Sequence, residues 1–143
     1  MNKTTLFFLF ILFNVGITFS YSQVFNITYS NKLGENKSPK IATFYINDAK
    51  NEITYSDEVE TFKYSPLELS ETKYEQGLYF EIYNPTLSDL IDNPGIKRIF
   101  RFGYDKPGGK PVLVAKITYF SKDKYYVRLY YTDYYFELGS NRN

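Results

Sequence analysis

The segment LVAKITYFSKDKYYVRLYY, residues 113–131, decides the fold, because it contains two alternating runs joined by a short polar turn. Every second residue from Leu113 to Tyr119 is apolar, and so is every second residue from Tyr125 to Tyr131. If Tyr119 faces Tyr125 and Leu113 faces Tyr131, both sets share one face of a β-hairpin. A slip of one residue would turn the whole set over, so the register is well specified. We expect this odd-numbered face to point into the core.

The rest of the chain repeats this pattern of short β-branched and aromatic runs between Gly, Pro, Asn and Asp clusters, which is typical of all-β domains. The pattern predicts strands over residues 24–29, 41–47, 52–56, 59–64, 78–83, 97–104, 111–120, 124–132 and 134–138. In a second hairpin, Ile46 opposite Ile53 and Phe44 opposite Tyr55 would share an inward face.

The one predicted helix spans residues 85–92, with Pro85 near its start and Asn93-Pro94-Gly95 after its end. Many short antiparallel strands in a chain of this size form a sandwich or a barrel. We therefore predict an all-β fold, an antiparallel sandwich or small barrel. It would be a meander of about eight to nine short strands with one short helix near residues 85–92.

In the tyrosine-rich end of the chain, the alternation of apolar residues shifts by one position. Its apolar residues are odd-numbered through Tyr131, whereas Tyr134, Phe136 and Leu138 are even-numbered. This change of parity predicts a bulge or tight turn at Thr132-Asp133 between two strand segments.

The N-terminus has the form of a cleavable secretory signal. Lys3 precedes the apolar run LFFLFILF, residues 6–13, and small residues follow. The apolar run is shorter than the ~20 residues of a spanning helix. Ser20 and Ser22 fit a cut before Gln23, and an alternative cut would follow Ser20.

These features predict a signal peptide over residues 1–22 and a single all-β domain over residues 23–143, with no membrane span after cleavage. The predicted location is secreted (extracellular) or periplasmic. In a eukaryotic host, Asn26 in the sequon Asn26-Ile27-Thr28 would be a glycosylation site.

The chain contains 16 Tyr and 13 Phe but no Cys, no His and no Trp. Without Cys there are no disulfides, and without His the Ser-His-Asp and Cys-His nucleophiles and the usual zinc sites are excluded. We expect no cofactor, no metal and no catalysis. Carboxylates cluster in three places, which leaves a carboxylate-dependent hydrolase as an alternative. The clusters are Asp57, Glu58 and Glu60; Glu68, Glu71 and Glu75; and Asp89 and Asp92.

Charge is distributed unevenly along the chain. Residues 48–92 hold eleven acids and three bases, whereas residues 93–143 hold four acids and ten bases. Acidic and basic strands could pair across the sheet, or the molecule could have one basic face. The basic and aromatic run over residues 97–104 resembles nucleic-acid-binding segments, but the overall charge is close to zero, so no nucleic acid is expected.

The remaining candidate surface is the even-numbered face of the C-terminal hairpin. Tyrosine rings beside hydrogen-bonding side chains suit a sugar or a peptide strand, and the same residues are also common on any sheet. The candidate ligand-binding residues are Tyr126, Arg128, Tyr130, Lys116 and Tyr135.

The sequence thus predicts a small secreted or periplasmic β domain that acts by binding a protein, a glycan or an apolar ligand. Its partner would be an unknown protein or glycan. A hydrolase is one alternative, and a structural or adhesive cell-surface component, whose tyrosine-rich edge strand pairs with other chains, is another.

Overall fold

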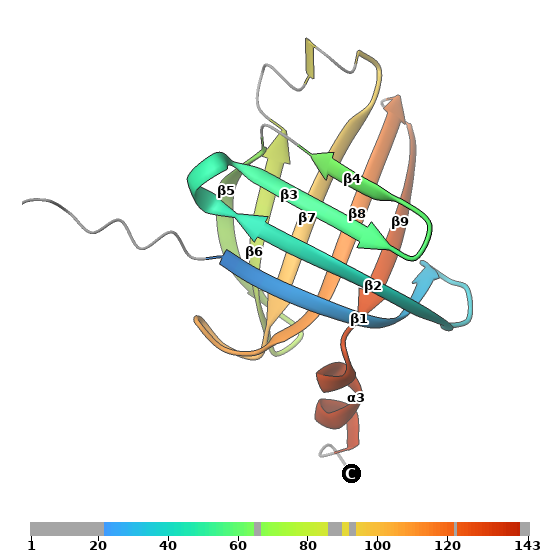
Figure 1. Cartoon of the computed structure of the whole chain (residues 1–143), viewed down its shortest axis with the longest axis vertical. Helices are drawn as coiled ribbons and strands as arrows, with labels where there is room; N and C mark the ends of the chain where they lie inside the picture. The colour runs from blue at the N-terminus through green and yellow to red at the C-terminus, as the bar shows by residue number, and fades with distance from the viewer. Residues whose placement is uncertain (1–21, 65–66, 86–89, 92–93, 122, 141–143) are drawn as a thin grey trace, which may run out of the picture.

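The computed structural model describes residues 22–64, 67–85, 90–91, 94–121 and 123–140. The predicted signal peptide, except Ser22, lies outside these residues and stays a prediction. Within them the chain is almost entirely antiparallel sheet with a short C-terminal helix, which confirms the predicted all-β class (Figure 1).

Nine strands follow one another along the described chain. They are β1 (Ser22–Lys32), β2 (Ser38–Asn47), β3 (Glu52–Asp57), β4 (Thr61–Tyr64), β5 (Leu67–Glu75), β6 (Leu78–Pro85), β7 (Lys97–Tyr104), β8 (Pro111–Ser121) and β9 (Lys124–Tyr131). A 3-10 turn, η1 (Asp48–Lys50), joins β2 to β3, and the helix α3 (Asp133–Ser140) ends the described chain.

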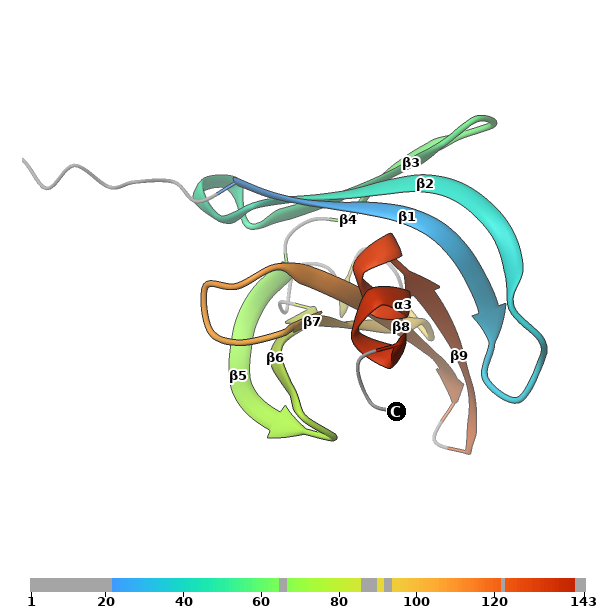
Figure 2. The same cartoon turned by 90° about the horizontal axis from the view of Figure 1, so that it is seen from below.

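All nine strands belong to one sheet in the order β4-β3-β2-β1-β9-β8-β7-β6-β5. Strand β1 pairs with β2 along its length, but it pairs with β9 only from Tyr29 to Lys32. The β1–β2 register shifts between Ile27 and Tyr29, and such irregularities bend a strand. The sheet therefore folds over, and β1–β4 lie across β5–β9 as a second layer (Figure 2).

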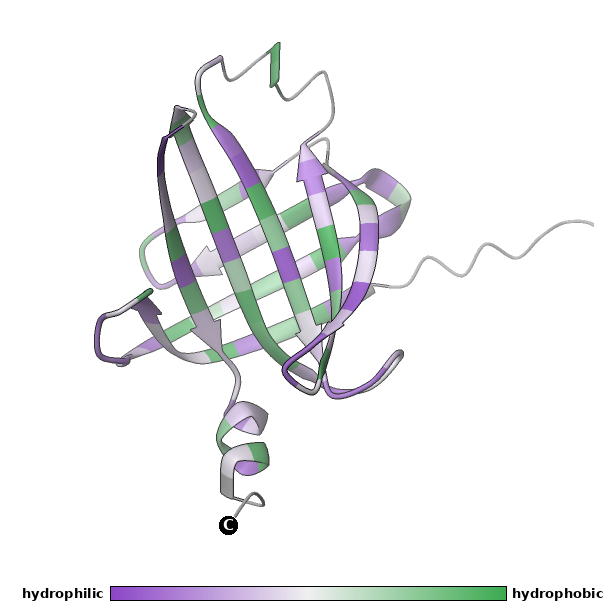
Figure 3. Cartoon of the chain, turned by 180° about the vertical axis from the view of Figure 1, so that it is seen from behind, coloured by the Kyte–Doolittle hydropathy of each residue, from purple (hydrophilic) through white to green (hydrophobic). Residues whose placement is uncertain are grey.

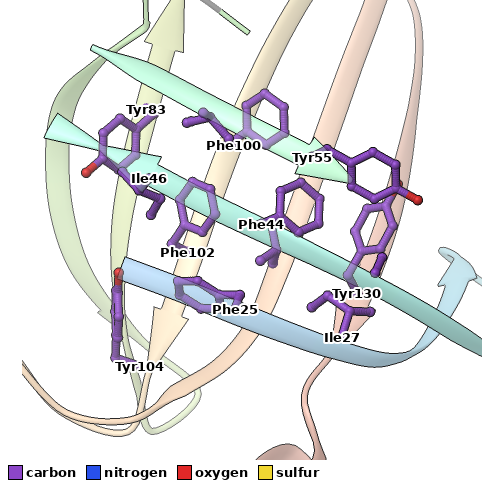
Figure 4. Packing of buried hydrophobic residues seen from close by; sticks show 13 residues of the cluster. Phe25, Ile27, Phe44, Ile46, Tyr55, Tyr83, Phe100, Phe102, Tyr104 and Tyr130 are labelled. Atoms are coloured by element: carbon purple, nitrogen blue, oxygen red, sulfur yellow. The ribbon is translucent and has the colours of Figure 1, made fainter. Parts of the chain in front are cut away.

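Aromatic rings fill the space between the two layers (Figure 4). Phe44 of β2 contacts Tyr130 of β9, with ring centroids 4.9 Å apart. Phe25 of β1 contacts Phe102 of β7 at 5.1 Å, and all four side chains are buried. Buried aromatic side chains carry large apolar areas, so this interlayer core holds together a chain that has no disulfide.

Both predicted hairpin registers are confirmed. Ile46 faces Ile53, and Tyr119 faces Tyr125. The inward face is also correct for the first hairpin but wrong for the second. In β8 and β9 the even-numbered residues, including the fully buried Val114, face the other layer. Both faces of this hairpin are apolar, so alternation alone does not say which one the second layer covers.

Strand β5 is absent from the sequence-based prediction, because the segment LELSETKYE alternates apolar with charged side chains and has few β-branched residues. It forms a hairpin with β6 through Gln76 and Gly77, which both have positive φ. Two such residues make a type I′ turn, for which Asn-Gly is the usual sequence. Because Gln76 stands where Asn is usual, the sequence did not indicate this hairpin.

The predicted strand over residues 134–138 is wrong, since these residues lie in helix α3. The change of parity at Thr132-Asp133 marks the end of β9 and the start of that helix. Thr132 donates its backbone N–H and its hydroxyl to the carbonyl oxygen of Val112, at 3.0 and 2.8 Å. These bonds fix the point at which the chain leaves the sheet.

The helix predicted over residues 85–92 is mostly outside the described residues. Pro85 is the last residue of β6, and Leu90 and Ile91 are helical.

Gly103 of β7 tests the packing of the sheet. A Cβ atom there would lie 2.9 Å from the Phe80 ring and 3.4 Å from Leu113. We expect Gly103→Ala to lower the free energy of unfolding by about 1–3 kcal/mol, measured by urea denaturation. Gly139→Ala is the matched control, because its Cβ would meet nothing within 4 Å and alanine favours helix. Equal effects of the two changes would contradict this packing.

Asp57, at the end of β3, accepts four hydrogen bonds. The donors are Lys40 Nζ at 2.6 Å, Tyr55 Oη at 2.7 Å, and the N–H groups of Val59 and Glu60 at 2.9 Å. These bonds, the Lys40 one foremost, hold the pKa of the Asp57 carboxyl well below its usual range.

A carboxyl with a lowered pKa stabilises the fold above its unfolded-state pKa of about 3.9, and this contribution is lost as the pH falls further. We therefore expect Asp57→Asn to be less stable than the parent at pH 7, with a difference that shrinks below about pH 4. Thermal unfolding at several pH values measures this difference. Glu58→Gln, which changes an exposed acid of the same turn, should show no such pattern. A difference that is constant with pH would exclude this role for Asp57.

Candidate functional site

The face of β6–β9 that points away from the interlayer core forms the floor of an apolar groove. A cavity of about 630 Å³ lies on it. Leu78 and Phe80 of β6 line one side, Ala115 of β8 lies in the middle, and Val127 and Leu129 of β9 line the other side. Hydrophobic residues recur along all of these strands, among hydrophilic ones (Figure 3).

Helix α3 follows β9 and contacts β8 at one end of the sheet (Figure 2). Its residues Tyr135, Phe136 and Leu138 line the cavity. The Tyr135 ring lies 4.6 Å from that of Tyr131, and the Phe136 ring lies 5.0 Å from that of Tyr29. Tyr135, a predicted binding residue, is therefore part of this groove.

One ion pair borders the groove. Arg101 of β7 donates to the carboxylate of Glu75, and its guanidinium lies 4.6 Å from the centre of the Phe80 ring. This pair joins the acidic and basic halves of the sequence, as expected if their charges pair across strands. Arg101 lowers the pKa of the Glu75 carboxyl. The two charges offset each other, so the walls of the groove stay mostly apolar.

The other four predicted binding residues lie on the opposite face, toward β1–β4. Tyr130 is only 5% exposed and belongs to the aromatic core, so its predicted outward orientation is wrong. Tyr126 is 40% exposed, and Lys116 and Arg128 are half-buried at the rim of the interlayer space. The predicted surface of tyrosines is thus divided between core and rim, because a second layer of the sheet covers this face.

Three basic side chains meet at this rim: Arg98, Lys116 and Arg128, hereafter the cationic cluster. Lys116 lies directly opposite Arg128 in the β8–β9 ladder. The pKa of Lys116 is lowered by burial first, and then by the positive charges of Arg98 and Arg128. The Glu60 carboxylate raises this pKa, but its effect is the smallest of the four. In the described part of the chain, none of the three forms an ion pair with a carboxylate.

Tyr64 of β4 supplies an aromatic partner to the cluster. Its hydroxyl lies 3.4 Å from Lys116 Nζ, and the Arg98 guanidinium lies 5.7 Å from the centre of its ring. Thr118, between Arg98 and Tyr126 in the ladder, is 3% exposed. Its hydroxyl has no hydrogen-bond partner among the described residues.

The carboxylates singled out in the sequence do not converge. Asp57 holds a turn, Glu75 pairs with Arg101, and Asp89 and Asp92 lie outside the described residues. A different pair of carboxylates, Asp48 and Glu81, comes together. Burial, and after it the negative charge of the nearby Asp48, raise the pKa of the Glu81 carboxyl.

Two tyrosines accompany this second pair. Tyr83 donates to Asp48 at 3.0 Å, and Tyr104 lies 3.4 Å from Glu81. The groove cavity borders neither carboxylate. Within the described ranges no group of three or more His, Cys, Asp or Glu side chains could hold a metal.

The groove was missed because the sequence assigned its floor to the core. The signal was present: the odd- and even-numbered residues of β8 are both largely apolar, which is typical of a strand covered on both faces. The cationic cluster could be inferred only in part, since Lys116 and Arg128 share a predicted face but Arg98 and Tyr64 come from other strands.

No helix of the described residues is long and apolar enough to span a membrane. Compared with protein-family models, curated proteins and solved structures, the chain matches none of them.

Like charges directly opposite in a ladder destabilise a sheet by roughly 0.2–1 kcal/mol, and partial burial adds a desolvation cost to Lys116. We expect Lys116→Met to raise the free energy of unfolding by about 0.5–1 kcal/mol in buffer with chloride as its only anion. Urea denaturation measures the change. Lys97→Met, an exposed change on β7, should stay within about 0.5 kcal/mol of the parent. A lower stability of Lys116→Met would show that its contacts with Tyr64 outweigh the repulsion.

Proposed function

We propose that this chain is a non-catalytic binding protein whose groove on β6–β9 takes a small, elongated apolar ligand such as an acyl chain. The observation that carries the proposal is the cavity of about 630 Å³ lined by apolar side chains of β6, β8, β9 and α3. Small-molecule sites have volumes of roughly 300–1,000 Å³ and mostly apolar walls.

The backbone of the groove favours a small molecule over a peptide strand. Strands β6, β7 and β8 each pair with a neighbour along both edges, whereas β9 pairs with β1 only over Arg128–Tyr131. Most of the floor therefore offers side chains rather than free backbone groups. A peptide strand binds by adding to a free edge. A glycan needs several hydrogen-bonding groups, whereas the charged groups at the groove, Arg101 and Glu75, already pair with each other.

The proposed function also includes the predicted location of the protein outside the cytoplasm. An apolar compound dissolves poorly in water, and a secreted or periplasmic protein with an open apolar groove would carry or capture it outside the cytoplasm.

The alternative functions have less support. The convergence of Asp48 and Glu81 favours a carboxylate-dependent hydrolase, but the groove lies apart from that pair. For a structural component, the outermost strands of the sheet are β4 and β5, and β1 and β9 are also unpaired with each other outside Tyr29–Lys32 and Arg128–Tyr131. Edge β5 carries exposed Glu68, Glu71 and Lys73, and charged side chains on an edge oppose pairing with other chains.

Binding of the neutral fluorescent probe N-phenyl-1-naphthylamine, and its displacement by 1-dodecanol, tests the proposal. Ala115 lies between Arg101 and Leu129 on the groove floor. We expect Ala115→Leu to fill this space and to weaken probe binding about tenfold or more, which corresponds to ~1.4 kcal/mol.

Ala49→Leu is the matched control, because it adds the same atoms at an exposed position of η1. Circular dichroism checks that both variants keep the parent fold. Absence of probe binding to the parent chain, or equal binding by the two variants, would refute an apolar ligand site in the groove.

A further inference from the structure

We propose that the cationic cluster of Arg98, Lys116 and Arg128, together with Thr118, is a second binding site that receives an oxyanion: a carboxylate, sulfate or phosphate group. The site lies on the face of β7–β9 opposite the groove, so it is separate from the apolar ligand proposed above.

The charges of the cluster support this assignment. Lys116 faces Arg128 across the β8–β9 ladder, and Arg98 opposes Thr118, one step along the same face of the sheet. Like charges so arranged repel one another, and partial burial makes the repulsion stronger than in water. Among the described residues, no ion pair with a carboxylate offsets it. A bound anion would offset all three charges at once.

Thr118 is an independent sign of a ligand. Its side chain is 3% exposed, and its hydroxyl finds no hydrogen-bond partner in the described chain. Burying a polar group without a partner destabilises the folded state, so such groups are rare in folded proteins. The hydroxyl belongs to the same strand face as Lys116, where it can donate a hydrogen bond to an oxyanion held by the cluster.

The surroundings suit a small anionic group. Tyr64 covers the cluster from β4, with its hydroxyl 3.4 Å from Lys116 Nζ. The exposed Tyr126 ring, which stacks on Phe120 at 5.5 Å, flanks Thr118 on the other side. Arg side chains present several donors in a fixed plane, which matches the oxygens of carboxylate, sulfate and phosphate.

An NMR titration of the full-length chain tests the site. Sodium sulfate, sodium phosphate and sodium glucuronate are added separately, with sodium chloride keeping the ionic strength constant. We expect saturable shifts of the backbone amide signals of positions 116–118, which every variant retains. Thr118→Val and Arg98→Gln should each weaken binding about tenfold, since each removes one donor to a charged group.

Lys97→Gln is the matched control for Arg98→Gln: it removes the same charge from the neighbouring, exposed position of β7 and should leave the affinity within about twofold. Thr118→Val replaces an unpartnered hydroxyl, so it should be at least as stable as the parent in chloride. Weaker anion binding by this variant would therefore not result from unfolding.

Tighter binding of glucuronate than of sulfate or phosphate would identify the source as an acidic sugar, and the reverse order a free inorganic ion. Either order supports an oxyanion site. Lack of saturable shifts with all three anions would overturn the proposal, and so would equal affinities of the parent, Thr118→Val and Arg98→Gln. Binding of the neutral probe in the groove should be unaffected by these substitutions, because the cavity borders neither Thr118 nor Arg98, so the two proposals fail separately.

Discussion

The folding-over of one nine-stranded sheet is the constraint on which the rest of the structure depends. Strand β1 belongs to both layers: it pairs with β2 from Ser22 to Ser30, and its last four residues, Tyr29–Lys32, pair with β9. The buried side of β1 also switches at the register shift. Before the shift the odd-numbered Phe25 and Ile27 are buried, and after it the even-numbered Ser30 is buried. The bend lets Phe44 reach Tyr130 and Phe25 reach Phe102, and these contacts form the core.

The same constraint gives β7–β9 two different faces with two chemistries. In β7, Arg98 lies at the rim of the interlayer space, and three residues later Arg101 lies at the groove. In β8, Ala115 is part of the groove floor and its neighbour Lys116 is part of the cationic cluster. Because alternate residues of a strand point to opposite sides, each strand contributes to both regions without a loop or an added domain.

The sequence predicted local pairing well and three-dimensional placement less well. The hairpin registers through Ile46–Ile53 and Tyr119–Tyr125 follow from side chains that are neighbours in the chain. The side covered by the second layer depends on contacts such as Phe44–Phe100, between residues more than 50 positions apart, which alternation cannot indicate. Helix α3 was missed for a related reason: its tyrosines favour strands locally, and the hydrogen bonds of Thr132 with β8 direct them out of the sheet.

The position of β1 beside β9 also has a consequence for how the chain folds. The strands β1–β4 form one meander of hairpins and β5–β9 another, and each needs only contacts between neighbours in sequence. The pairs that join the two meanders connect Tyr29–Lys32 with Arg128–Tyr131, about 100 positions away, and contacts of such long range form slowly. Two preformed halves would then dock late, through the aromatic surface between them. Docking of this kind allows two copies of the chain to exchange halves, so that β1–β4 of one molecule covers β5–β9 of another.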